Sequence, residues 1–230
     1  MMESAITHTY PPVDVSIVIT NYNRGRFLYR AIRSCLDQLL IRKTLEVIVV
    51  DDCSTDDSLL LLREFNFDVR VVAGKENRGV AYASNIGLRE AKGKYWMRVD
   101  ADDFLNKHAC SIMSMILDQN SHFDFVYCDH YRVSMHGSKE ELVRLDNDEA
   151  LRNHGAGILF RTEALRAIGG YDESLRNAED YDLLVRINKS GSRGFYLPIS
   201  LYRYYIHGSN LTMQADRQES IEAVRDRHGI

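Results

Sequence analysis

The sequence predicts one α/β domain with a mainly parallel sheet and helices on both faces. Four apolar or β-branched runs carry this prediction, and each is followed by a polar stretch and then a helical pattern. Strands and helices that alternate in this order favour right-handed crossovers and a parallel sheet. The 230 residues are enough to bury a substantial core. The four runs are 15–20, 45–50, 69–72 and the run that begins at Tyr95.

Composition excludes several classes of protein. The net charge of -4 gives no electrostatic basis for binding nucleic acid or an anionic membrane. No apolar run is long enough to span a bilayer, and residues 1–13 predict a loose arm, not a signal peptide. The widely spaced cysteines fit reduced, buried thiols. We therefore expect a cytoplasmic protein with at most peripheral contact at the inner membrane face.

The first half of the chain has the layout of a nucleotide site. The run 15–20 ends in the polar turn 21–25, and a helix is expected over 26–40. The run 45–50 continues into Asp51 and Asp52, whose carboxylates could accept hydrogen bonds from a ribose or a base. No G-x-G-x-x-G follows the first run, so the usual dinucleotide fingerprint is missing. Further helices are expected over 58–65 and 81–91.

The stretch 95–103, YWMRVDADD, is a buried strand that ends in three carboxylates, Asp100, Asp102 and Asp103. Carboxylate oxygens gathered at one strand end suit Mg²⁺ or Mn²⁺, which keep positions open for phosphate oxygens. Acidic triplets are also common in loops, and Asp103 could instead cap the helix expected over 106–119. Arg78, near the start of the preceding helix, would suit a diphosphate or could be a solvated surface residue.

The second half has a looser rhythm. A short strand is expected over 125–128, a charged loop over 134–150, a short apolar run over 157–160 and a short helix over 161–168. Glu179 and Asp180 begin a further helix. The helix dipole stabilises acidic residues in a first turn, so these two residues could be there for that reason alone. The segment 216–230 predicts a polar helix.

These strings resemble the inverting family 2 glycosyltransferases with a GT-A fold. The matching stretches are VSIVITNYNRGRFLYRAIRSCLDQ, VIVVDDCSTDDS, NRGVAYASNIGLREAKGKYWMRVDADD and GGYDESLRNAEDYDLLVRI, which follow the family's order over residues 14–207. The resemblance implies a nucleotide-sugar-binding half over 14–103 and a smaller acceptor-binding and catalytic half over 104–215 of the same domain. The arm 1–13 and the tail 216–230 would flank them.

The resemblance also implies the donor and its contacts. The donor would be a nucleotide diphosphate sugar, most often UDP-linked, with Thr20 and Tyr22 against the nucleoside and Asp52, in preference to Asp51, reading the uracil or ribose. Mn²⁺ or Mg²⁺ would bind Asp102, His207 and Asp100, and Ser209 would help to complete this shell. Asp100 would also contact the ribose or the sugar. The donor-contact set is then Thr20, Tyr22, Arg24, Asp52, Arg78, Asp100 and Ala101.

An inverting transfer needs one base opposite the leaving diphosphate. The resemblance assigns that role to Asp180, with Glu179 beside it as a contact to the acceptor or donor sugar. The expected activity is hexosyl or N-acetylhexosaminyl transfer to a hydroxyl of a sugar, glycolipid or polysaccharide acceptor, and the chain is a candidate homodimer. One departure concerns Ser84, where the family often has an arginine. The contact of that arginine with the donor phosphate or sugar would then be missing or be made by Arg78 or Arg89.

Two other functions compete with this one. A nucleotidyltransferase would need a Gly-rich phosphate loop after the first strand, which residues 21–25 do not supply. A non-catalytic, glycosyltransferase-like nucleotide-binding module is favoured only by Ser84. Release of UDP from a UDP-sugar would distinguish the enzyme from the binding module.

Overall fold

The computed structural model describes residues 12–134, 138–208, 210 and 216–230. Its core is a sheet with the strand order β3-β2-β1-β4-β8-β6-β9-β5, and β7 pairs with β6 outside that path. The strands are β1 (Val15–Asn21), β2 (Leu45–Asp51), β3 (Arg70–Ala73), β4 (Tyr95–Asp100), β5 (Phe104–Leu105), β6 (Phe125–Val133), β7 (Lys139–Val143), β8 (Leu159–Arg161) and β9 (Gly194–Tyr205).

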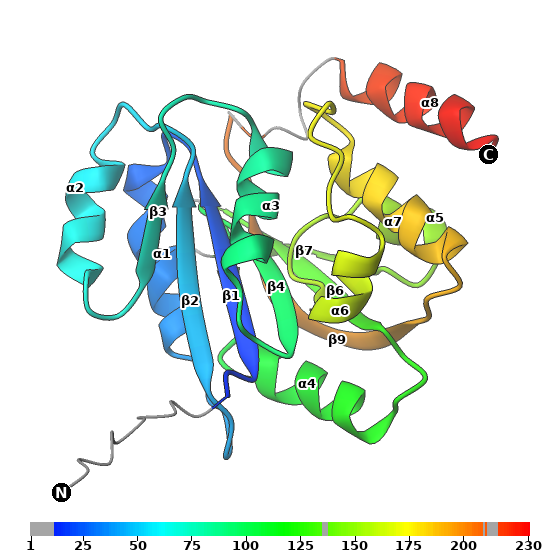
Figure 1. Cartoon of the computed structure of the whole chain (residues 1–230), viewed down its shortest axis with the longest axis horizontal. Coiled ribbons are helices and arrows are strands. Elements are labelled where there is room, and N and C mark those ends of the chain that lie inside the picture. The colour runs from blue at the N-terminus through cyan, green and yellow to red at the C-terminus, as the bar shows by residue number, and fades with distance from the viewer. Residues whose placement is uncertain (1–11, 135–137, 209, 211–215) are drawn as a thin grey trace, which may run out of the picture.

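Helices cover both faces of the sheet (Figure 1). They are α1 (Gly25–Leu36), α2 (Ser58–Leu62), the 3-10 turn η1 (Arg63–Phe65), α3 (Val80–Glu90), α4 (Ala109–Gln119), α5 (Asp148–Arg152), α6 (Thr162–Ala167), α7 (Glu179–Lys189) and α8 (Arg217–His228). None of the helices in the described part of the chain is both long and apolar enough to span a membrane.

The first four long strands form the parallel part of the sheet, as the alternating pattern predicts. β1 pairs in parallel with β2 and β4, and β2 pairs in parallel with β3. All seven residues of β1 are buried, because helices cover both of its faces. β8 then joins β4 in the antiparallel sense. The polar end of β1 and the acidic ends of β2 and β4 consequently meet at one edge of the sheet.

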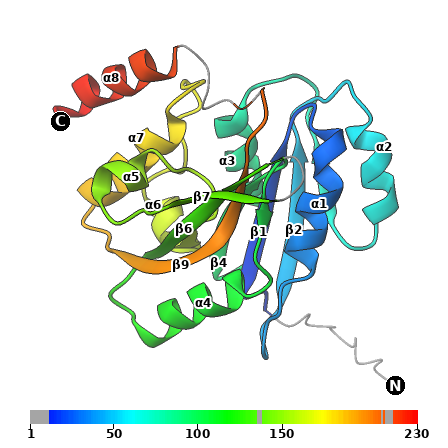
Figure 2. The same ribbon diagram turned by 180° about the vertical axis from the view of Figure 1, so that it is seen from behind.

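Alternate residues of each parallel strand enter different cores, one on each face. Ile17 and Ile19 of β1 pack with α1 and α4 on one face, which Figure 2 shows from its own side. Val18 packs with α3, α6 and α7 on the other. Each fully buried aliphatic side chain of this kind stabilises the fold by roughly 1.5–3 kcal/mol. This two-sided burial holds the ends of the strands in place beneath the site.

Several predicted elements differ in extent from those observed. The segment 134–150, expected as a loop, contains β7 and the start of α5. β6 continues beyond Cys128 to Val133 because it pairs with β9. The helix expected over 106–119 begins at Ala109, and Asp103 does not cap it. The helix expected over 81–91 is α3, which ends in extended backbone at Ala91. The predicted polar helix near the C-terminus is confirmed as α8.

α8 packs on the outer side of α7 (Figure 1). Ile221 and Val224 form a small buried cluster with Tyr181 and Val185 of α7. His228 contacts Asp182 at 2.9 Å, and Arg227 pairs with Asp172 at 2.7 Å. α8 therefore supports the helix that carries Glu179 and Asp180.

Candidate active site

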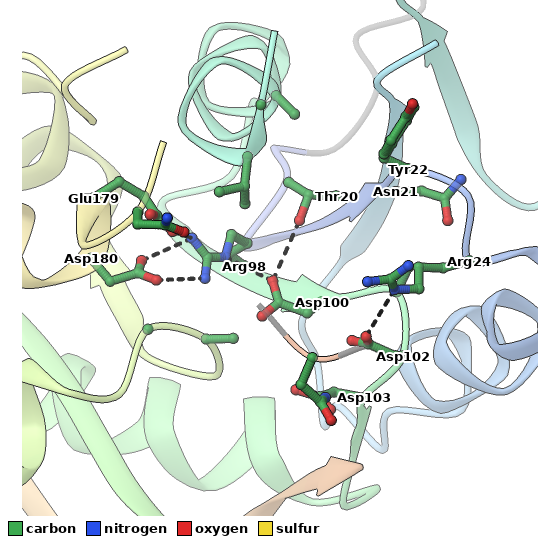
Figure 3. A pocket seen from close by; sticks show the side chains of 18 of the residues that line it. Thr20, Asn21, Tyr22, Arg24, Arg98, Asp100, Asp102, Asp103, Glu179 and Asp180 are labelled. Atoms are coloured by element: carbon green, nitrogen blue, oxygen red, sulfur yellow. Dashed lines mark hydrogen bonds and ion pairs between the residues drawn. The ribbon is translucent and has the colours of Figure 1, made fainter. Parts of the chain in front are cut away.

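A cavity of about 460 Å³ opens at the carboxyl ends of β1, β2 and β4. This is the edge of an open α/β sheet where ligands bind, and the volume suits a small-molecule site. Figure 3 shows its acidic floor, with Asp100 near the centre, Asp102 on one side and Asp180 on the other. The predicted residues that line it are Thr20, Tyr22, Arg24, Asp52, Asp100, Ala101, Asp102, Glu179 and Asp180.

The two carboxylates after β2 have different surroundings. Asp51 is fully buried and accepts hydrogen bonds from the Asn21 side chain at 2.6 Å and the Ser54 amide at 2.8 Å. Asp52 lines the cavity and accepts the backbone N–H groups of Arg78 and Gly79 at 3.0 and 2.7 Å. Asp52 thus joins the end of β2 to the start of α3 while it faces the cavity.

The acidic triplet divides into three environments. Asp100 ends β4, accepts a 3.4 Å hydrogen bond from the Thr20 hydroxyl and borders the cavity. Asp102 lies 2.9 Å from His207 Nε2 and 3.2 Å from Arg24 Nε. Asp103 is 1% exposed and accepts hydrogen bonds from the Tyr202 hydroxyl and the Tyr205 amide at 2.7 and 2.8 Å. Asp103 therefore fastens the turn after β4 to β9.

Asp102 and His207 together fit a cation shared with a substrate. They offer a carboxylate oxygen and an imidazole nitrogen that already point at one another, and both atom types are ligands of Mn²⁺. Among the described residues there is no group of three or more acidic, histidine or cysteine side chains arranged to hold a metal alone. Two protein ligands with other positions left to phosphate and water are characteristic of magnesium-type sites. Ser209 lies outside the described residues.

A buried arginine joins Asp180 to the floor of the cavity. Arg98 of β4 is 3% exposed, and its Nη1 and Nη2 donate to Asp180 Oδ1 and Oδ2 at 2.8 and 2.9 Å. Its Nε lies 3.1 Å from Asp100 Oδ1, and its Nη1 lies 3.8 Å from Glu179 Oε1. This bidentate geometry is the strong form of a carboxylate–guanidinium pair.

Glu179 and Asp180 occupy the first turn of α7, whose partial positive charge favours carboxylates. The residue before them, Ala178, has a left-handed backbone with φ of 62°, which turns the chain abruptly into the helix. Burial together with the charge of Asp180 raises the pKa of Glu179 to about 8. Glu179 is therefore protonated at neutral pH and is able to donate a hydrogen bond.

Other residues suggested by the sequence lie outside the cavity. The Arg78 guanidinium stacks 3.7 Å above the Tyr82 ring and contacts Glu173 at 3.4 Å. Arg89 is 3.9 Å from the same carboxylate. Ser84 is fully buried and bonds to the Val80 carbonyl. Neither arginine lines the cavity at the place where Ser84 departs from the family pattern.

Two residues of this site were missed in the sequence. Arg98 lay inside a run interpreted as apolar, although it precedes Asp100 by two positions and so shares its face of the strand. An arginine within a buried strand was the available signal, because such a charge requires a partner. Gly155 was the second: a Cβ at this position would lie 1.9 Å from Asp180 Oδ2. No local pattern marks that contact.

The chain resembles known glycosyltransferases in sequence and structure. The model of the family described as Glycosyl transferase family 2 matches residues 16–169. The chondroitin synthase of Escherichia coli is 29% identical over 228 residues, which cover 93% of this chain and 32% of that protein. The chain thus spans about a third of this relative.

Two solved structures share the fold. The structure of S. aureus TarS 1-349 in complex with UDP-GlcNAc has a TM-score of 0.78 and 22% identity, with 93% of this chain and 66% of that chain covered. The mannosyltransferase PcManGT from Pyrobaculum calidifontis, in complex with GDP-Man and Mn²⁺, has a TM-score of 0.68 and 22% identity, with 88% and 59% covered. At these identities the structural likeness establishes the α/β fold.

Proposed function

Because the chain belongs to glycosyl transferase family 2, we propose that it is a metal-dependent inverting glycosyltransferase with a UDP-linked donor. The observation that carries this proposal is the placement of two acidic groups on opposite sides of one cavity (Figure 3). Asp102, paired with His207, lies on one side, and Asp180 lies on the other. An in-line displacement needs these two functions on opposite faces of the reacting sugar.

The donor would lie over the ends of β1, β2 and β4, within the half formed by residues 14–103. Thr20, Tyr22 and Asp52 would contact the nucleoside, and Asp100 the ribose or sugar. The presence of UDP-GlcNAc in the TarS complex supports a UDP-linked hexose or N-acetylhexosamine. The GDP-Man of the mannosyltransferase complex makes GDP the alternative to test.

Asp102 and His207 would hold Mn²⁺ or Mg²⁺ beside the diphosphate, with Asp100 as a further candidate ligand. When bound, the cation would neutralise negative charge on the departing diphosphate. Arg24, 3.2 Å from Asp102, keeps that carboxylate oriented in the free protein. The structural relative that contains Mn²⁺ supports the choice of metal.

Asp180 would act as the general base. The acceptor hydroxyl oxygen bonds to the anomeric carbon while the bond from that carbon to the diphosphate oxygen breaks. The hydroxyl proton passes to Asp180, and the nucleoside diphosphate leaves with the bonding electron pair. Each Asp180 oxygen accepts one hydrogen bond from Arg98, so each retains a lone pair for this proton.

The acceptor would enter from the half formed by residues 104–215. Asn153, His154 and Gly155 line the cavity near Asp180. Burial lowers the pKa of His154 to about 4, so it stays neutral and can hydrogen-bond a sugar. The chondroitin and hyaluronan synthases among the relatives support an acceptor in polysaccharide synthesis.

Calorimetric titration tests the donor site. UDP and GDP are added with and without Mn²⁺ to the wild type and to Asp102→Ala. We expect UDP to bind in a Mn²⁺-dependent way that the variant loses. GDP binding in place of UDP would overturn the donor assignment. Equal binding to both proteins in the presence of Mn²⁺ would overturn the metal site.

Release of UDP from a panel of UDP-sugars, in the presence of candidate acceptors or water, tests catalysis. We expect Asp180→Asn to lose turnover by 10²–10⁴-fold, the usual contribution of a general base, while its affinity for UDP is unchanged. If the variant turns over near the wild-type rate, Asp180 is not the base. If wild type binds UDP but releases none from any sugar, the chain acts as a nucleotide-binding module.

A further inference from the structure

Arg98 is a buried cation that contacts both sides of the cavity. It extends from β4, where it lies on the same face as Asp100, and its guanidinium reaches the first turn of α7 (Figure 3). One edge of the group, Nε, faces Asp100 at 3.1 Å, and the other two nitrogens grip Asp180 at 2.8 and 2.9 Å. A single side chain thus links a donor-contact residue to the base.

The bidentate pair determines where the Asp180 carboxylate points. Both of its oxygens are held by one planar group, so the carboxylate cannot rotate without losing a hydrogen bond. Lysine, with a point charge on a flexible stem, cannot reproduce this fork. A base must lie within hydrogen-bonding reach of the acceptor proton, and rotation of Asp180 would therefore reduce the rate directly.

The same contact also places a buried positive charge against Asp180. Asp100 and Glu179 also lie beside this guanidinium, at 3.1 and 3.8 Å. Tyr171 and His154, which also lie near this group, remain neutral because burial raises the pKa of the first and lowers that of the second. Arg98 is the positive charge in direct contact with Asp180 in the described structure. Without it, the buried Asp180 carboxylate would lose this charged partner, and a buried charge without a partner is costly.

We propose that Arg98 is the positioning residue of the base: it orients Asp180, places a positive charge against it and links it to the donor contact Asp100. This inference rests on the proposed function, in which Asp180 receives the acceptor proton. Arg98 acts through Asp180 and does not itself exchange a proton. Its guanidinium is consequently needed for its shape as well as for its charge.

The test compares Arg98→Met, which removes the charge, with Arg98→Lys, which keeps the charge and removes the fork. Turnover of the UDP-sugar and its pH profile are measured at saturating Mn²⁺. We expect Arg98→Met to reduce kcat about 100-fold and to move the acidic limb of the profile upward by about one pH unit or more. Arg98→Lys should also lower kcat, but the acidic limb of its pH profile should stay close to the wild-type position because the positive charge is kept.

A double-mutant cycle separates this role from a merely structural one. If Arg98 acts through Asp180, adding Arg98→Met to Asp180→Asn should change the residual rate by less than about threefold, since residues that act as a unit are not additive. The proposal would be overturned if Arg98→Met reduced the rate of Asp180→Asn by the same factor as it reduces the wild-type rate. It would also be overturned if the acidic limb of the pH profile did not move in Arg98→Met. The matched control is Arg132→Met, which removes an exposed arginine paired with Glu141 on β7.

Two further readouts keep the result interpretable. UDP affinity of Arg98→Lys within about threefold of wild type would show that the donor site is folded, so that a loss of kcat belongs to the base. If Arg98→Met does not fold, the cycle is run with Arg98→Lys. Near-wild-type turnover of Asp180→Asn would refute the base assignment itself, independently of how Arg98 variants behave.

Discussion

Gly155 lies against the carboxylate of Asp180, and the substitution Gly155→Ala should displace it. A Cβ at this position would be 1.9 Å from Oδ2 and 2.2 Å from Cγ of Asp180. Cβ atoms in real proteins essentially never lie closer than 3.0 Å to a non-bonded heavy atom. The oxygen must therefore retreat by at least 1.1 Å, the difference between these two distances.

A displacement of this size is large for catalysis. A retreat of this size, directed away from Arg98, would lengthen the hydrogen bonds of 2.8 and 2.9 Å beyond the usual hydrogen-bonding distance. A misplacement of about 1 Å costs roughly 100-fold in rate, which corresponds to about 2.7 kcal/mol of transition-state stabilisation. We expect Gly155→Ala to lower kcat by about this factor and to leave UDP affinity unchanged, because the contact lies away from the proposed donor residues.

The assay is UDP release at saturating donor, together with calorimetric binding of UDP. Gly191→Ala is the matched control: Gly191 has φ of 84° and no atom within 4 Å of its built Cβ. Alanine there costs about 1 kcal/mol of stability through backbone strain alone, with turnover retained. Wild-type kcat in Gly155→Ala would refute the view that Asp180 must keep its observed position.

Three further predictions follow from other parts of the site. His207→Ala should weaken Mn²⁺-dependent UDP binding by roughly tenfold or more and leave metal-free binding unchanged; equal losses with and without Mn²⁺ in calorimetry would contradict a ligand role. The pKa of Glu179 is raised to about 8 in the folded protein, from 4.5. The folded protein therefore keeps a proton on Glu179 that the unfolded chain has released between about pH 4.5 and 8. The free energy of unfolding should fall across this range as pH rises, by at most ~1.4 kcal/mol per pH unit. Glu179→Gln should remove that slope in urea unfolding at pH 5, 7 and 9, whereas parallel curves for the two proteins would refute it. Val224→Ala, in the contact of α8 with Tyr181, should cost roughly 1–3 kcal/mol of unfolding free energy and should also lower kcat if α8 positions α7; unchanged kcat would limit α8 to a stabilising role.

Much of the first half of the chain could be predicted from sequence because its signals are local. A buried parallel strand has a continuous apolar run, and its end is marked where carboxylates and hydroxyls begin. That is why the strands ending at Asn21, Asp51 and Asp100 were predicted within one or two residues. The convergence of their ends follows from parallel pairing. The site roles of their residues remain predictions to be tested.

The second half depends on pairing between distant segments, and its prediction was less accurate. β7 consists of largely exposed, charged residues and exists because it pairs with β6. β9 is twelve residues long and pairs with β6 through a register shift between Cys128 and His130, and the proline within it argues against a continuous strand. Such strands have no strong period of their own, because tertiary contacts outweigh intrinsic propensity in sheets.

The sequence by itself determined the α/β class, the edge of the sheet where acidic groups gather, and the candidates for metal, donor and base. The class and the edge are properties of short stretches and their position relative to a strand or a helix, whereas the roles proposed for metal, donor and base residues rest on the resemblance of such stretches to the family. Only the tertiary structure decided that Arg98 and Asp180, 82 positions apart, form a bidentate pair, and that Gly155 makes room for it. The physical reason is that a buried charge needs a partner, while the identity of that partner depends on how α7 packs against β4.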